Sequence, residues 1–348
     1  MLTVFIAMAG CALRPRTAAP VLEPVASGPV WPSPPNVPRY AFAGVLIGER
    51  NFLAPDQEKS NTVRSALAWV AGLLIGEPTY AELQRPVSGM TDKRGWIYVV
   101  DASHKAVVVF DMTGHRLRFW RRAAENVPFK SPVVITADGR GGFLVTDAEL
   151  GEVFRLGPDG QPLGRFGKAI LGRPTGVARD DATGRIYVAD TKNHDIKIFD
   201  DDGTLVDTLG ARGTDPGMFN APTHLLFRNG RLYVADTFNF RIQVFDRSGD
   251  GRLTFGRLGL FVGNMTRPKG VAVGGDGRIY VIESYYDHLL VFDRSGRLLL
   301  PIGGTGSEIG RFYLPSGVWT DDFGRVYVAD MFNGRIVVFK ELTDVGRI

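Results

Sequence analysis

The sequence predicts an all-β fold, a six-bladed β-propeller whose ring is closed by an N-terminal strand. A short apolar stretch that ends in an acidic residue recurs six times, at Tyr98–Asp101, Leu144–Asp147, Tyr187–Asp190, Tyr233–Asp236, Tyr280–Glu283 and Tyr327–Asp330. The acidic positions lie 43 to 47 residues apart, and such a period combined with strand patterning is typical of propeller blades. Each copy predicts a small four-stranded sheet, which can bury both faces only by packing against its neighbours around an axis.

Length and composition agree with one large globular domain. The 348 residues suit a single propeller, and the 44% hydrophobic and 22% charged content excludes a chain disordered throughout. No apolar run reaches the roughly 18 residues that a membrane-spanning helix needs. Cys11 is the only cysteine, which excludes an intramolecular disulfide and a cysteine-based metal centre.

The N-terminus carries features of an exported lipoprotein. Its first ten residues are apolar and uncharged, and Met8–Cys11 resembles the bacterial lipobox, in which the cysteine is lipidated. The match departs from the pattern, because Met replaces the usual Leu and no basic residue precedes the apolar run. We expect residues 1–11 to be a signal segment with Cys11 as the lipidation site. The alternative is an ordinary N-terminus with a chance cysteine.

Residues 12–39 predict a tether. They contain eight prolines and almost no apolar periodicity, which favours an extended polyproline-type chain over a packed element. Ala12 stands after the cysteine instead of Asp, and this resembles an outer-membrane sorting signal. We therefore expect an outer-membrane lipoprotein of the bacterial cell envelope, held at the membrane by its lipid. Whether it faces the periplasm or the outside stays open.

The propeller is expected over residues 40–340. Its blades are predicted at 85–120, 130–167, 173–210, 220–256, 267–303 and 314–340. Blade three shows the whole pattern, from Arg173-Pro-Thr-Gly-Val-Ala through Gly184-Arg-Ile-Tyr-Val-Ala-Asp190 to Ile196-Lys-Ile-Phe-Asp200. These motifs resemble the NHL repeat family of β-propellers, most clearly in blades three to six. The Gly-His and Trp-Asp marks of WD40 repeats are missing.

The last blade lacks an outer strand of its own. It stops at Phe339 with only a short tail, 341–348, behind it, whereas Ala43–Gly48 near the N-terminus reads as an unpaired outer strand. We expect this strand to pair with the third strand of blade six and close the ring. Closure removes two sheet edges that would otherwise invite aggregation.

An insertion at about 57–84 separates that strand from blade one. Ser60 and Asn61 can cap a helix, and apolar residues follow at helical spacing. Gly76 and Pro78 are expected to end this helix. One interpretation is a helix that covers apolar surface on one propeller face. The other is a docking element or a lid on the channel mouth.

The recurring Asp and Asn residues at the ends of the second strands are expected to stabilise turns, so departures from the repeat are better functional clues. His224 stands where three other blades carry glycine, His104 replaces a repeated Asn, and His194 follows one. The NHL resemblance implies an alternative here, because amidating lyases of this type bind zinc at the axis through several histidines and related lactonases bind calcium. Only His224 lies on an inner strand, so that ligand pattern is not met, and we expect no cofactor.

Arg116–Arg122 interleaves arginine with aromatic residues, a composition that can bind nucleic acid. It also fits an outer strand whose arginines face outward while Leu117 and Phe119 face inward. We prefer the second interpretation and expect no nucleic-acid partner.

The sequence therefore favours a monomeric, non-enzymatic scaffold that displays the loops of one face to a protein partner in the envelope. No hydrolase or phosphate-binding motif is present. The alternative is a metal-dependent lyase or lactonase-type enzyme with zinc or calcium near His224. The candidate contacts for a partner are aromatic and arginine side chains of one rim: Phe238, Phe240, Arg241, Tyr285, Tyr286 and Phe332.

Overall fold

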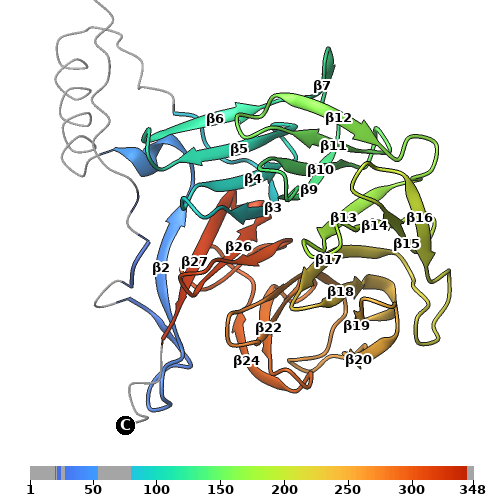
Figure 1. Ribbon diagram of the computed structural model, residues 1–348. Helices are drawn as coiled ribbons and strands as arrows, with labels where there is room; N and C mark the ends of the chain where they lie inside the picture. Colours follow the sequence, from blue (N-terminus) through green and yellow to red (C-terminus); the bar gives the residue numbers. More distant parts are fainter. Residues whose placement is uncertain (1–19, 21, 25–27, 54–79, 343–348) are drawn as a thin grey trace, which may run out of the picture.

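The computed structural model describes residues 20, 22–24, 28–53 and 80–342. The expected lipidation site Cys11 and the expected helix of the insertion lie outside these residues. Figure 1 shows sheets arranged around a central axis, and the inner strands β3, β9, β13, β17, β21 and β25 contact one another in that order before β25 returns to β3. The six-bladed propeller is thus confirmed.

Each of the first five blades is a four-stranded antiparallel meander, with strands listed from the axis outward. Blade one comprises β3 (Pro86–Thr91), β4 (Ile97–Asp101), β5 (Ala106–Asp111) and β6 (Arg116–Trp120). Blade two comprises β9 (Pro132–Ala137), β10 (Phe143–Asp147), β11 (Glu152–Leu156) and β12 (Pro162–Phe166). Blade three comprises β13 (Pro174–Arg179), β14 (Ile186–Asp190), β15 (Asp195–Phe199) and β16 (Leu205–Leu209).

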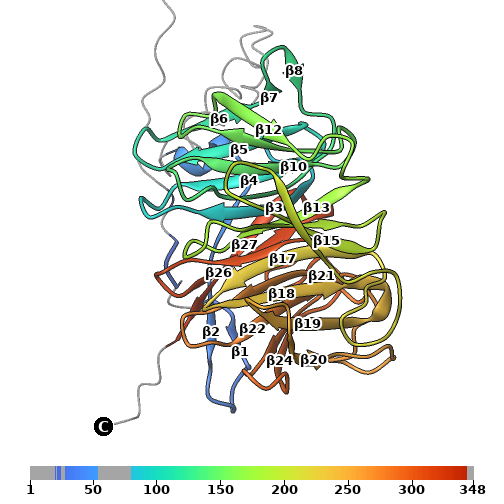
Figure 2. The same cartoon turned by 45° about the vertical axis from the view of Figure 1, so that its right-hand side comes forward.

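The remaining blades follow the same order. Blade four comprises β17 (Pro222–Arg228), β18 (Arg231–Asp236), β19 (Arg241–Asp246) and β20 (Gly251–Phe255). Blade five comprises β21 (Pro268–Val273), β22 (Ile279–Glu283), β23 (His288–Phe292) and β24 (Leu298–Gly303). Blade six contains β25 (Val318–Thr320), β26 (Arg325–Asp330) and β27 (Arg335–Glu341). A hairpin of β7 (Arg122–Ala124) and β8 (Val127–Pro128) stands out from the ring between blades one and two (Figure 2).

The core lies between the blades. The second strand of each blade is buried on both faces, which explains its nearly continuous run of apolar residues. Tyr98 of blade one and Phe143 of blade two, for example, place their ring centroids 4.5 Å apart. Every blade therefore depends on both neighbours for burial of its apolar faces, as expected for a radial repeat.

The N-terminal strand closes the ring as predicted. β2 (Tyr40–Leu46) pairs antiparallel with β27 and so serves as the fourth strand of blade six. Figures 1 and 2 both place β2, drawn in blue, beside the last strands of the chain. Tyr40 lies opposite Glu341, so β27 extends one residue into the segment expected to be a tail. A short 3-10 helix, η1 (Glu49–Phe52), follows β2.

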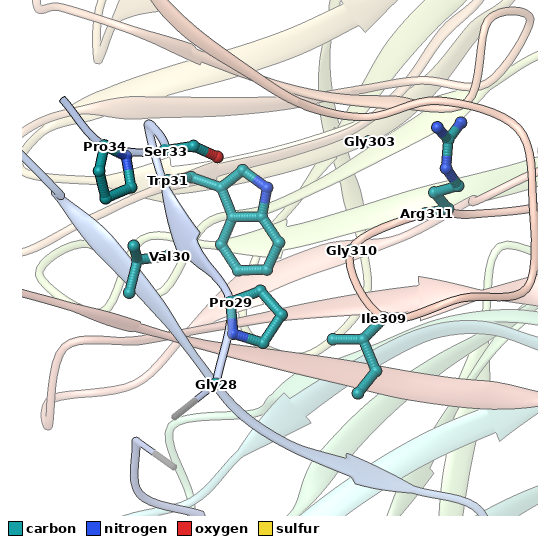
Figure 3. Close-up of a pocket in the computed structure, with 10 residues that line it drawn as sticks. All are labelled: Gly28, Pro29, Val30, Trp31, Ser33, Pro34, Gly303, Ile309, Gly310 and Arg311. Carbon is teal, nitrogen blue, oxygen red and sulfur yellow. The ribbon is translucent and has the colours of Figure 1, made fainter. Parts of the chain in front are cut away.

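The tether prediction needs correction at its C-terminal end. Residues 28–39 are not a free linker, because β1 (Val30–Trp31) pairs with β2 and adds a fifth strand to blade six. The Trp31 ring packs edge-on against Phe339 at 5.1 Å. A Cβ at Gly310 would overlap the indole, so glycine lets the loop approach it, and Figure 3 shows both residues in the wall of a surface pocket. Proline on either side of β1 is tolerated because β1 is an edge strand.

Among the described residues, no helix is long and apolar enough to cross a membrane.

Candidate binding face

The acidic residues that end the second strands tie together the loops of one face, which we call the upper face. Asp101 is fully buried and accepts hydrogen bonds from the backbone amides of Gln84 and Arg85, in the loop entering the blade. It also accepts from Ser103 and His104, in the loop between the second and third strands. The corresponding acids bind the entering loop in the same way, through Lys130 and Ser131, Gly172 and Arg173, Asn220, Arg267, and Tyr313.

These contacts confirm the turn-stabilising role expected for the acidic residues. Because each carboxylate bridges two loops, the upper face has a backbone fixed by buried hydrogen bonds. Side chains that project from this backbone are therefore held in a defined arrangement.

Three of the predicted contact residues are exposed on this face. Phe238 in η2 (Thr237–Asn239), Tyr285 and Phe332 in η3 (Met331–Asn333) have exposed fractions between 47% and 57%. They occupy the loops between second and third strands of blades four, five and six. Phe240 and Tyr286 are half-buried, and the Tyr286 ring lies edge-on to Tyr285 at 4.8 Å. The structure thus places one exposed aromatic ring in each of three adjacent blades.

Arg241, which was predicted to contact a partner, instead stabilises the structure of a loop. Its Nε donates to Asp236 at 2.9 Å, and its other guanidinium nitrogens donate to the carbonyl oxygens of Thr214, Asp215 and Met218. Only 12% of its side chain is exposed. Arg241 clamps loop 211–219 and is not available as a contact for a partner.

Sequence reasoning missed two residues beside Phe332. The Tyr313 ring lies 5.5 Å from that of Phe332 and is half-exposed, and the Arg85 guanidinium lies 5.2 Å from the Phe332 centroid. Tyr313 follows the buried Phe312 at the place where Asn220 follows Phe219 in blade four. The aromatic residue at this position is a departure from the repeat, and it is the signal in the sequence that could have identified Tyr313.

A second missed feature is loop 257–264, which leads into blade five. Leu260 and Phe261 are exposed at 85% and 81%. The loops that enter blades four and six are clamped by Arg241 and by Arg335, whose guanidinium binds the carbonyls of residues 307, 308 and 311. Blade five carries His288 at this position. Loop 257–264 therefore lacks the arginine clamp, and its apolar residues face solvent.

The three histidines considered as metal ligands occupy separate places. His224 lines the axial cavity, which is walled by residues of all six inner strands. The His104 ring hydrogen-bonds the carbonyl of Glu82 at 2.7 Å, and Nδ1 of His194 accepts from the amide of Ala221 at 3.0 Å. The described part of the chain contains no group of three His, Cys, Asp or Glu side chains placed to hold a metal.

The environment of His224 governs its charge. A Cβ at Gly176 would lie 2.9 Å from the Cα of His224, so glycine lets these inner strands approach closely at this level. Burial in the channel lowers the pKa of His224 to about 4, because the desolvated imidazolium is disfavoured. At neutral pH the ring is uncharged, with one N–H donor and one acceptor nitrogen.

Comparison with known proteins now identifies the repeat. The family model described as NHL repeat matches residues 171–199, which span the first three strands of blade three. The chain is thus a six-bladed β-propeller in which blade three matches an NHL repeat. No curated protein matches the sequence of this propeller.

Solved structures share the propeller fold at low sequence identity. Virginiamycin B lyase from Staphylococcus aureus is 14% identical, with 74% of this chain and 96% of that chain covered and a TM-score of 0.55. An auxiliary nutrient binding protein from Bacteroides thetaiotaomicron is also 14% identical, with 74% and 69% covered and a TM-score of 0.58. A protein of unknown function from the same organism is 17% identical, with 75% and 70% covered and a TM-score of 0.58. These similarities show the fold.

Proposed function

We propose that this NHL-repeat propeller is a non-enzymatic binding module of a bacterial envelope, which displays its upper face to a protein partner. The observation that carries the proposal is the set of exposed rings in three adjacent blades, Phe238, Tyr285 and Phe332, on loops fixed by buried carboxylates. Tyr313 and Arg85 extend this set beside Phe332.

The chemistry of this set suits a protein interface. Aromatic and arginine side chains are enriched in interface hot spots, and aromatic rings bury much area at a low cost in conformational entropy. Loops that are already ordered by Asp236, Glu283 and Asp330 lose less entropy on binding than free loops would. The propeller acts as a rigid monomeric ring whose loops confer specificity.

Alanine substitution tests this proposal. A variant with Phe238→Ala, Tyr285→Ala and Phe332→Ala should lose a partner that the native chain captures from envelope extracts. Phe323→Ala is the matched control: Phe323 is 55% exposed but lies in the turn between β25 and β26, at the opposite end of β26 from Asp330. Equal capture by the triple variant and the control would contradict the proposal.

The envelope location rests on the N-terminal sequence. We propose that Cys11 carries the lipid and that the residues after it link it to the propeller, against which Leu22 and Glu23 already pack. Expression in a Gram-negative host with a radiolabelled fatty acid should label the chain and place it in the outer-membrane fraction. Cys11→Ser should abolish the label and release the protein, whereas unlabelled native protein would contradict the anchor.

An enzyme with its site at His224 is the second candidate. One observation favours it: His224 is an ionisable side chain in the axial cavity at a position where blades three, five and six carry glycine. One of the similar structures is described as a catalytically inactive variant of virginiamycin B lyase with quinupristin. Conversion of a ligand by the native chain, lost in His224→Gly, would establish this candidate in place of the scaffold.

A further inference from the structure

The axial cavity is lined by positively charged side chains without negatively charged ones. Its volume is about 170 Å³, and its lining comes from all six inner strands. The lining contains two arginines, Arg179 and Arg228, together with His224, and it contains no Asp or Glu. A cavity with cationic groups and no carboxylate favours an anion in its interior.

Only one of these cations is uncompensated. Arg179 is paired with Asp181 and Asp201. Arg228 has no carboxylate partner within the described residues, and its one side-chain hydrogen bond there is a long one, 3.4 Å from Nη1 to Oγ1 of Thr320. Its Nε and second amino group make no hydrogen bond within the described residues, so they can bind the two oxygens of one carboxylate, the geometry that guanidinium groups recognise.

Most of the other lining residues are apolar, and Thr91, Thr136 and Thr320 add polar groups. Valines 177, 271 and 318 and Ile135 contribute to the walls from four different blades. His224 lies four residues before Arg228 on β17, about 13 Å along an extended strand. Because burial keeps His224 uncharged, it adds a polar group at that end without a second positive charge. The cavity thus offers one cationic end and, beyond it, walls made mostly of apolar residues.

We propose that the axial cavity is a binding site for a short-chain aliphatic carboxylate, with its carboxylate on Arg228 and its hydrocarbon chain along the channel toward His224. The volume holds about five or six waters at ~30 Å³ each, so it suits a molecule of a few carbons and not a drug-sized ligand. This site is separate from the aromatic residues of the upper face.

The test uses the full-length chain and isothermal titration calorimetry with hexanoate and its neutral counterpart hexanamide. Hexanoate should bind saturably with one site per chain, and hexanamide should bind at least tenfold more weakly because it cannot form the charge-assisted pair. Arg228→Gln should reduce hexanoate affinity at least tenfold. Arg231→Gln is the matched control, since Arg231 lies opposite Arg228 on the same hairpin and is exposed.

Arg228→Lys provides a second variant if Arg228→Gln does not fold. Lysine keeps the positive charge but cannot donate two parallel hydrogen bonds to one carboxylate. This variant should therefore bind hexanoate more weakly than the native chain and more tightly than any neutral replacement. The proposal is overturned if the native chain shows no saturable hexanoate binding at millimolar concentration. Equal affinities for hexanoate and hexanamide, or for Arg228→Gln and Arg231→Gln, would overturn it as well.

Discussion

Arg241 donates from Nε to Oδ2 of Asp236 at 2.9 Å, and both side chains are buried at the junction of two loops. The same bond recurs between Arg335 and Asp330 in blade six at 2.7 Å. In each case the guanidinium also holds the carbonyls of the loop that enters the blade. This buried ion pair therefore fixes the backbone of the loops that it joins. The exposed aromatic rings next to the pair depend on it for their positions.

Removal of that clamp should cost stability. Arg241→Ala would leave the buried Asp236 carboxylate without its cation and free the carbonyls of loop 211–219, and we expect a loss of about 3 kcal/mol in the free energy of unfolding. Urea denaturation measures the change. Arg252→Ala, which breaks the exposed pair with Asp246 in the same blade, should change stability little. Equal effects of the two substitutions would contradict the assigned role of Arg241.

Closure of the ring by β2 should keep the protein monomeric. A chain that starts at residue 47 lacks β1 and β2 and exposes the edge of β27, which offers unpaired backbone groups to other chains. We expect this chain to aggregate or dimerise in size-exclusion chromatography with light scattering, whereas a chain that starts at residue 28 should elute as a monomer. A monomeric, stable chain from residue 47 would show that closure does not depend on this strand.

His224 should make stability depend on pH. Its pKa falls from 6.5 to about 4 on folding, so the unfolded chain takes up a proton in a range where the folded chain does not. Stability contributed by the neutral ring is therefore present above about pH 6.5 and is lost as the pH falls toward about 4. We expect His224→Gly to lose less stability than the native chain over this window in urea titrations. Parallel curves would contradict a buried, neutral His224.

Metal analysis separates the two candidate functions. Since His104 and His194 are bonded to backbone groups away from the axial cavity, we expect the chain purified without chelator to contain no stoichiometric zinc or calcium. Mass spectrometry of the digested protein measures this content. A stoichiometric metal that is lost in His224→Gly would favour the enzyme.

The repeat made the fold predictable, because each blade carries the same buried second strand and the same terminal acid. The closing strand was also predictable, since blade six lacks an outer strand and Ala43–Gly48 supplies one. β1 could not be predicted. It has two residues between prolines, and its stability comes from tertiary packing of Trp31 on Phe339, which leaves no periodic pattern.

The candidate site was predictable only in part. Exposed aromatic loop residues such as Phe238 and Tyr285 follow from their place in the repeat. The role of Arg241 does not, because arginine suits both a surface contact and a clamp on backbone carbonyls. Arg228 was missed for the opposite reason: an arginine at the end of an inner strand becomes informative only when the cavity wall is known to lack acids.

Photo-crosslinking tests the proposed binding face most directly. A photoreactive amino acid in place of Tyr285, at 57% exposure, is compared with the same amino acid in place of Phe323, at 55% exposure on the opposite face. In envelope membranes we expect a discrete crosslinked protein from position 285 and none from position 323. The same products from both positions, or none from position 285, would contradict a partner on the upper face.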